Sequence, residues 1–279
     1  MNENRLFSNI ENVFLNTTNA PTGVEFIDEI NEVKVNGSQI NLILTPNKID
    51  GLTILNKIAY TSYSLGKNVL HLNIGDYNEP GVTSDLNKKR VYALMIDKPL
   101  TSIIYKYKSA LNEVKLKEIE LKELGGDIIY YEFNKNNTIT YNDIVNKIKE
   151  LNDITKFDTI LIDFENYVSV NSKFNYMLSY LNKFLSSLNI PIYFGINKEN
   201  NNINIDELVL NKLNLLIDIS ISDKQRDYKL SSISIYNSIY DKIFKLYKSC
   251  KYNNNTLKII EIKRKEYSTN ELNIYNDNI

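Results

Sequence analysis

The stretch that decides the fold is Gln39–Leu65, QINLILTPNKIDGLTILNKIAYTSYSL. It opens with a short apolar run, Gln39–Leu44, which is typical of a buried strand. It closes with Ile54–Leu65, where apolar residues recur every four positions, so this part predicts a helix. Gly66 stands just past that helix and is placed to cap its carboxyl end. A buried strand, a turn and a helix in this order form the repeating unit of α/β proteins.

The same alternation continues along the chain. Further apolar runs predict strands at Asn68–Ile74, Asp127–Phe133, Thr159–Phe164, Ile190–Ile196, Leu213–Ile221 and Leu257–Lys263. Helical periodicity separates them at Leu100–Leu124, Ile144–Leu151 and Phe174–Leu188, whereas Ser231–Ser249 mixes both patterns. Strands that are apolar throughout need cover on both faces, so we expect an α/β fold with a mainly parallel, twisted sheet flanked by helices. Its central strands should include Gln39–Leu44, Thr159–Phe164 and Ile190–Ile196.

Neither a composition break nor an internal repeat divides the 279 residues. We therefore expect one core domain over residues 20–266, preceded by an N-terminal arm at 1–19 and followed by a polar tail at 267–279.

The amino-acid composition excludes several kinds of functional site. A single Cys, Cys250, excludes a disulfide framework, and a single His, His71, excludes a His-based metal cluster. We expect His71 to be a core residue, because it lies on an apolar strand. With 33 basic and 34 acidic residues, the net charge of −1 gives no bulk attraction to nucleic acid. Without a membrane-length apolar run or a signal peptide, the sequence predicts a cytoplasmic protein. The abundance of Asn, Ile, Lys and Tyr, including 42 Asn, indicates an AT-rich genome, as in many phages and some low-GC bacteria.

The turn between the first strand and the first helix is where an α/β nucleotide-binding fold places its phosphate loop, GxxxxGK[ST]. Gly51 and Thr53 occupy the last Gly and the Ser/Thr position of that pattern. Leu52 occupies the Lys position, and Pro46 stands where the first Gly belongs. Lys48 lies in the same turn and offers an alternative cation. Taken by itself, the stretch fits an ordinary strand-to-helix turn better than a phosphate loop.

Three further segments, in their order and spacing, give a resemblance. They are Asn19–Ile30 (NAPTGVEFIDEI), Lys156–Tyr167 (KFDTILIDFENY) and Asn189–Asn197 (NIPIYFGIN). Together with Gln39–Leu65 they resemble the RecA-fold ATPase core of DnaB-type replicative helicases of bacteria and phages, and RecA/RadA-type recombinases are a close second. The resemblance implies a RecA-like P-loop NTPase fold.

The resemblance also assigns roles to residues. Asp163 matches the Walker B Asp and Thr53 the magnesium-binding residue, while Asn197 sits at the sensor position. The catalytic Glu of the family should fall near Gly75 and is missing, and Asp76 is the nearest substitute. With Leu52 in place of the phosphate-binding Lys, no cofactor is expected, and ATP with magnesium is implied only if the site works.

Two basic segments match the family's interfaces. Lys263, Arg264 and Lys265 align with the finger that reaches a neighbouring subunit's nucleotide, so the expected partner is a second copy or an active RecA-fold relative. Single-stranded DNA, held weakly, is the possible partner of one basic and aromatic group: Lys224, Arg226, Tyr228 and Lys229.

Three functions follow from these observations. A degenerate, ATPase-inactive accessory or scaffold protein of phage-type DNA replication or recombination explains both Leu52 and the missing Glu. A divergent, active ATP-dependent DNA helicase or recombinase requires replacements for both. A structural or interaction protein would reuse the fold alone.

Overall fold

The computed structural model describes residues 21–28, 40–46, 48–74, 84–133, 139–164, 171–197, 213–220, 231–237, 242–252 and 259–268. Within these ranges, no helix combines the length and apolar character that crossing a membrane requires.

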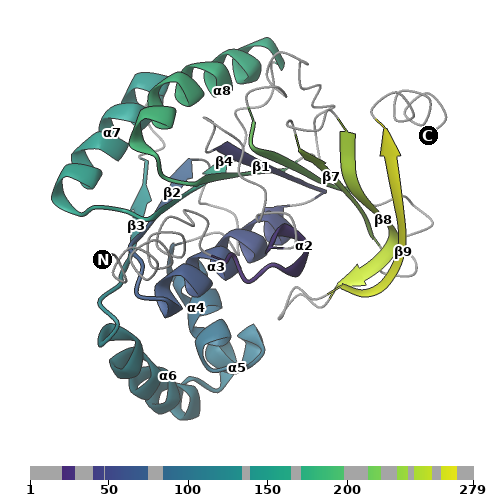
Figure 1. Cartoon of the computed structure of the whole chain (residues 1–279). Helices are drawn as coiled ribbons and strands as arrows, with labels where there is room; N and C mark the ends of the chain where they lie inside the picture. Colours follow the sequence, from purple (N-terminus) through teal and green to yellow (C-terminus); the bar gives the residue numbers. More distant parts are fainter. Residues whose placement is uncertain are drawn as a thin grey trace, which may run out of the picture.

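One sheet of nine strands organises the described part of the chain (Figure 1). In chain order the strands are Ile40–Thr45 (β1), Val69–Ile74 (β2), Ile128–Glu132 (β3), Thr159–Phe164 (β4), Ile192–Asn197 (β5), Leu215–Ser220 (β6), Ser231–Asn237 (β7), Lys242–Tyr252 (β8) and Ile259–Ser268 (β9). Their order in the sheet is β3-β2-β4-β5-β1-β6-β7-β8-β9. The six strands from β3 to β6 are parallel, and β7–β9 extend the sheet in antiparallel fashion.

The centre of the sheet confirms the sequence prediction. β4, β5 and β1, the three strands expected there, are neighbours, and every residue of β1 and β4 is buried. The register places Ile43 beside Gly195 and Gly195 beside Asp163. Because the strands are parallel, their carboxyl ends meet at one edge.

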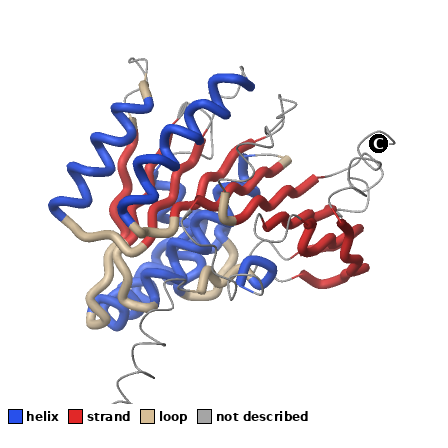
Figure 2. The backbone as a smooth tube through the Cα atoms, turned by 45° about the horizontal axis from the view of Figure 1, so that its top comes forward, coloured by secondary structure: helices blue, strands red, loops and turns tan. Residues whose placement is uncertain are grey.

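Helices cover both faces of the parallel part of the sheet (Figure 1; Figure 2). The helices are Glu25–Asp28 (α2), Lys48–Ser64 (α3), Ser84–Met95 (α4), Leu100–Tyr105 (α5), Tyr107–Lys122 (α6), Tyr141–Ile154 (α7) and Asn171–Leu185 (α8), with a 3-10 turn at Ser186–Leu188. α7 and α8 lie on one face, and α3 lies on the other with α4–α6 beyond it. Right-handed crossovers of parallel strands produce this double cover.

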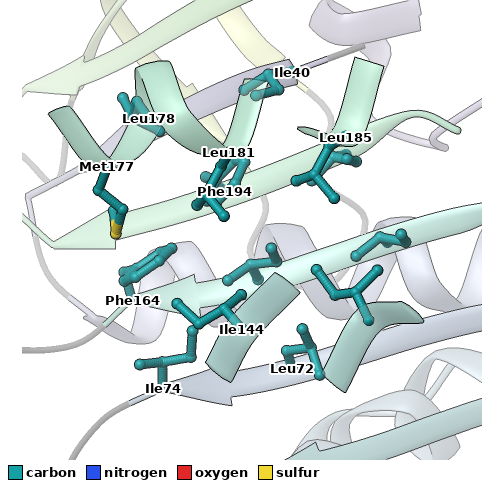
Figure 3. Packing of buried hydrophobic residues seen from close by; sticks show 14 of the residues in the cluster. Ile40, Leu72, Ile74, Ile144, Phe164, Met177, Leu178, Leu181, Leu185 and Phe194 are labelled. Atoms are coloured by element: carbon teal, nitrogen blue, oxygen red, sulfur yellow. The ribbon is translucent and has the colours of Figure 1, made fainter. Parts of the chain in front are cut away.

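The main core lies between the sheet and the pair α7 and α8. Ile144, Leu178 and Leu181 point from these helices onto Leu72, Phe164 and Phe194 of the strands (Figure 3). Phe164 and Phe194 stack with their ring centroids 5.5 Å apart. Each such side chain, fully buried, stabilises the fold by roughly 1.5–3 kcal/mol before entropy is counted.

A second core lies on the opposite face, under α3. Alternate residues of the same strands, including Ile43, Val69 and Leu161, pack there against Leu55 and Ile58. The period-two alternation of a strand sends neighbouring residues to opposite faces, so an apolar run supplies both cores.

Several boundaries differ from those that the sequence predicts. α3 begins at Lys48, six residues before the expected Ile54, and α7 begins at Tyr141 because Thr140 and Asp143 form a capping box. The predicted helix Leu100–Leu124 is divided at Lys106, which adopts a non-helical backbone. The mixed segment Ser231–Ser249 contains β7 and most of β8.

Gly66 caps α3 as expected. Its φ is +71°, and the N–H groups of Gly66 and Lys67 donate to the carbonyls of Tyr63 and Ser62 at 2.9 and 3.1 Å. This is the Schellman arrangement, which satisfies carbonyls that the helix end leaves free.

Candidate functional site

The candidate site lies where the carboxyl ends of β1, β4 and β5 meet. Thr45 ends β1 and is paired in register with Asn197, which ends β5. The chain leaves β1 through α3 on one face and reaches β5 through α8 on the other. In open α/β sheets such a change of direction opens a crevice at the strand ends, and ligands bind there.

The turn after β1 is short and leads directly into α3. Two residues, Pro46 and Asn47, separate β1 from the helix, which begins at Lys48. Gly51, Leu52 and Thr53 therefore lie in the first two helical turns. In an α-helix each N–H group donates to the carbonyl four residues back. The N–H groups of Leu52 and Thr53 consequently belong to the helix rather than to an open phosphate loop.

The side chains of this turn have structural roles. Leu52 is fully buried, so its side chain packs inside the protein. A Cβ on Gly51 would stand 3.0 Å from the Thr45 Oγ1 atom, tighter than most Cβ contacts, so this Gly allows α3 to lie close against β1. Thr53 is half-buried. The side chain of Lys48 lies outside the described part of the structure.

Asp163, the Walker B match, lies near the end of β4 with 6% of its surface exposed. Asn73 of β2 is its neighbour in register and is fully buried. Arg90 of α4, 8% exposed, lies close enough for the charge of Asp163 to act on its guanidinium. Burial lowers the pKa of Arg90, and the negative charge of Asp163 opposes that shift.

Hydrogen bonds hold Arg90 in place. Its Nη1 atom donates to Oδ1 of Asn87 at 3.0 Å, and Nδ2 of Asn56 donates to the same oxygen at 3.1 Å. The Asn56 Nδ2 atom also donates to the carbonyl of Leu52 at 2.8 Å. We call Asn56, Asn73, Asn87, Arg90 and Asp163 the Asn–Arg cluster.

The cluster is polar, buried and incompletely hydrogen-bonded. Among the described residues, Oδ1 of Asn56, Nδ2 of Asn87 and both amide atoms of Asn73 have no hydrogen-bond partner within the protein. Each buried polar atom without a hydrogen bond lowers the stability of the folded protein by about 1–3 kcal/mol. The cluster is therefore a destabilising feature of the fold.

The described acids of this edge do not form a metal cage. Within the described ranges, no group of three or more His, Cys, Asp or Glu side chains is placed to hold a metal ion. Asn73 is the register neighbour of Asp163. Magnesium would need further oxygen ligands beside this carboxylate, with room for its waters.

The remaining predicted residues lie elsewhere. Asn197 is partly exposed at the end of β5, beside Thr45. Lys263, Arg264 and Lys265 lie on β9, which three strands separate from β1, and their side chains lie outside the described residues. Also outside those residues are Asp76 and the group predicted to bind DNA, which is Lys224, Arg226, Tyr228 and Lys229.

His71 is a core residue, as expected. It is fully buried on β2, and its ring centroid lies 5.3 Å from that of Tyr130. Both ring nitrogens and the Tyr130 hydroxyl have no hydrogen-bond partner among the described residues. Burial lowers the pKa of His71 to about 3, so the imidazole is neutral at physiological pH.

The Pro-Thr-Gly segment has a structural explanation. The Asp28 carboxylate accepts hydrogen bonds from the Thr22 N–H at 2.6 Å, the Thr22 hydroxyl at 2.7 Å and the Gly23 N–H at 2.9 Å. These bonds close a compact turn against α3. This turn therefore explains the spacing of Thr22, Gly23 and Asp28 in the sequence.

Sequence reasoning missed the Asn–Arg cluster. α4 falls in a stretch for which no element was expected, and its Asn and Arg residues form no known motif. One signal was available, because Arg90 is one of four Arg beside 29 Lys. An Arg kept in a chain that otherwise uses Lys indicates a position that needs the guanidinium.

Comparisons with known proteins confirm the fold. No protein-family model and no curated protein matches the sequence. Among solved structures, the chain is similar to one described as an ATPase domain, with a TM-score of 0.61 and 11% identity over 94% of this chain and 98% of that chain. It is also similar to "The Structure Of A DnaB-Like Replicative Helicase And Its Interactions With Primase", with a TM-score of 0.60 and 10% identity over 94% of this chain and 67% of that chain. The chain thus shares the RecA-like α/β fold of DnaB-like replicative helicase domains.

Proposed function

We propose that this protein is a degenerate, ATPase-inactive relative of the DnaB/RecA-like ATPases that acts as an accessory or scaffold in phage-type DNA replication or recombination. The observation that carries the proposal is Leu52. It stands where the phosphate-binding Lys belongs, its side chain is fully buried, and its N–H group lies inside α3.

The chemistry explains why this position matters. Phosphoryl transfer is catalysed almost entirely by positioning and by charge at the transferring phosphate. Leu52 supplies neither, and the helical turn around it withdraws the backbone amides that a phosphate loop provides. ATP and magnesium are therefore not expected to bind productively.

In this function the protein acts by binding other macromolecules rather than by catalysis. One similar structure is that of a DnaB-like replicative helicase described together with its interactions with primase, and this chain matches 67% of that chain. We expect a core domain at 20–266 that associates with itself or with an active RecA-fold relative, in the cytoplasm, or in the host cytoplasm if a phage encodes it. The arm at 1–19 and the tail at 267–279 flank that domain.

Weak single-stranded DNA binding is part of the proposal. It would use Lys224, Arg226, Tyr228 and Lys229. Three cations imply a log–log salt slope of only about −2 on single strands. A titration across salt concentrations, with a variant carrying Ala at these four positions as the control, tests it. Binding that is absent at low salt, or unchanged in the variant, removes the DNA role and leaves the scaffold.

The alternative is an active helicase or recombinase. It is favoured by the position of Lys48, the first residue of α3, and it needs Asp76 in place of the missing Glu. A purely structural protein that reuses the fold is the third alternative.

One experiment separates the first two functions. Nucleotide binding and ATP hydrolysis are measured with and without single-stranded DNA, in the wild type and in Asp163→Ala. We expect no turnover in either protein. Turnover that Asp163→Ala abolishes would establish the active alternative, whereas turnover that survives the substitution would indicate a contaminating ATPase.

A further inference from the structure

A cavity of about 120 Å³ lies beside β3, away from the carboxyl ends of β1, β4 and β5. Side chains of α3, α4 and α6 and of the first part of β3 line it, and β3 is the first strand in the sheet order. Three tyrosines and three charged residues belong to the lining: Tyr63, Tyr92, Tyr130, Lys88, Glu118 and Asp127. The rest of the lining is apolar.

The size of the cavity limits what can enter it. An apolar cavity of about 150 Å³ takes up a benzene molecule, so this one has room for a group of roughly five non-hydrogen atoms. Val91 and Met95 form part of its wall and are 4% and 6% exposed. A group that enters must therefore be compact and must tolerate apolar surroundings.

A cation already lies against this lining. The Nζ atom of Lys88 stands over the ring of Tyr130, 6.0 Å from its centroid. The face of an aromatic ring carries partial negative charge and attracts cations. Because Lys88 is exposed, its contact with the ring is weak, and its side chain can turn into the solvent when another cation arrives.

Two carboxylates make one side of the cavity negative. Glu118 and Asp127 belong to the lining, and Glu118 is also paired with Lys122 at 3.0 Å. Their charges act inside the cavity, because burial, then Glu118 and then Asp127 raise the pKa of Tyr63. Tyrosine rings combined with acids attract cations and are typical of the aromatic cages that bind quaternary ammonium groups.

We propose that this cavity binds the head group of an alkylammonium compound, which replaces the Lys88 ammonium over the ring of Tyr130. The methyl groups of such a cation suit the apolar wall, and its permanent charge suits the tyrosine rings and the two acids. The site is independent of the proposed function, because it lies away from the strand ends where a nucleotide would bind. The ATPase and DNA-binding experiments therefore do not decide it.

Choline and its neutral isostere, 3,3-dimethylbutan-1-ol, test whether the charge matters. Each is titrated into the full chain, and binding is followed by saturation-transfer NMR of the methyl signals. We expect choline to bind with a dissociation constant on the order of millimolar, and the isostere to bind at least about fivefold more weakly. Equal or tighter binding of the isostere would overturn the proposal, and so would the absence of transfer to choline at tens of millimolar.

Lys88→Met tests the sign of the charge that the cavity accepts. The substitution removes the competing ammonium and keeps an apolar stem, so choline should bind about two- to fivefold more tightly. Lys89→Met is the matched control, because Lys89 is an exposed cation on the same helix and does not belong to the lining; its affinity for choline should equal that of the wild type. Weaker or unchanged binding by Lys88→Met would refute replacement of the Lys88 ammonium.

Substitutions of Tyr130 separate its ring from its hydroxyl. Tyr130→Phe keeps the ring and should bind choline as the wild type does, whereas Tyr130→Leu should bind about fivefold more weakly. Circular dichroism checks that each variant is folded, and Tyr92→Leu, at a half-buried position of the same lining, serves if Tyr130→Leu does not fold. Full affinity after the loss of either ring would overturn the proposal.

The alkylammonium group has two sources, a free compound and a methylated Lys side chain of another protein. A peptide that contains trimethyllysine is titrated in the same way. Binding at least about tenfold tighter than that of choline would identify a protein side chain as the source, and any weaker binding would identify a free compound.

Discussion

Acidification should destabilise this protein through His71, well before its carboxylates are protonated. In the unfolded chain His71 takes up a proton below about pH 6.5. In the folded protein burial lowers its pKa to about 3, because no partner within the described residues replaces the water that would solvate the imidazolium. Between these two values the unfolded state binds more protons, so the free energy of unfolding falls as the pH falls.

The size of the effect follows from the same two values. Each pH unit inside the window removes about 1.4 kcal/mol, so lowering the pH from 6.5 to 5 costs about 2 kcal/mol. Near pH 3 the total decrease in the free energy of unfolding that His71 causes reaches about 5 kcal/mol. For a protein whose total stability is about 5–15 kcal/mol, this contribution decides whether it remains folded in weak acid.

Urea denaturation followed by circular dichroism between pH 8 and pH 4 measures the effect. The comparison is with His71→Phe, which keeps a ring against Tyr130 but cannot titrate. Any cost of fitting the larger ring is independent of pH, so the decisive quantity is the difference in slope between the two proteins. Parallel pH profiles from 6.5 to 5 would refute the reasoning, because all other titrating groups are common to both.

Other substitutions test the turns around the site. Gly66→Ala should destabilise the protein by at least about 2 kcal/mol by thermal denaturation, because φ is +71° and a Cβ would clash with the Leu124 carbonyl oxygen. Gly125→Ala, at φ +88° with open space around the Cβ, isolates the backbone strain and should cost about 1 kcal/mol, so equal losses would contradict the clash. Asp28→Ala removes the acceptor of the Thr22 turn and should cost about 1–3 kcal/mol; an unchanged midpoint would show that this turn adds nothing.

The strands of the parallel sheet were predictable because their signal is local. Thr159–Phe164 has the same bounds in the sequence prediction and in the structure, and β1 and β5 differ by one or two residues. An uninterrupted apolar run is compatible with few structures other than a strand buried on both faces. The order of the central strands follows once helices are recognised between them.

The start of α3 was not predictable in the same way. Gly51 lowers helix propensity by about 1 kcal/mol relative to Ala, and Pro46 marks a turn, so the sequence indicates a loop up to Ile54. Packing against β1 reverses this preference. The Gly permits a contact with Thr45 that a larger residue would obstruct, and the buried Leu52 anchors the first turns. Tertiary contacts outweigh a local preference of that size.

The Asn–Arg cluster could not be recognised in the sequence because Asn is abundant throughout the chain. In a chain with 42 Asn, the three at positions 56, 73 and 87 carry no information by themselves. What distinguishes them is burial, because an Asn chosen only by codon bias is tolerated most easily on the surface, where water satisfies its amide. Asn56, Asn73 and Asn87 are each fully buried. The same codon bias that fills the loops with Asn therefore does not account for these three, and for two of them, Asn56 and Asn87, the hydrogen bonds that lead to Arg90 supply a structural reason.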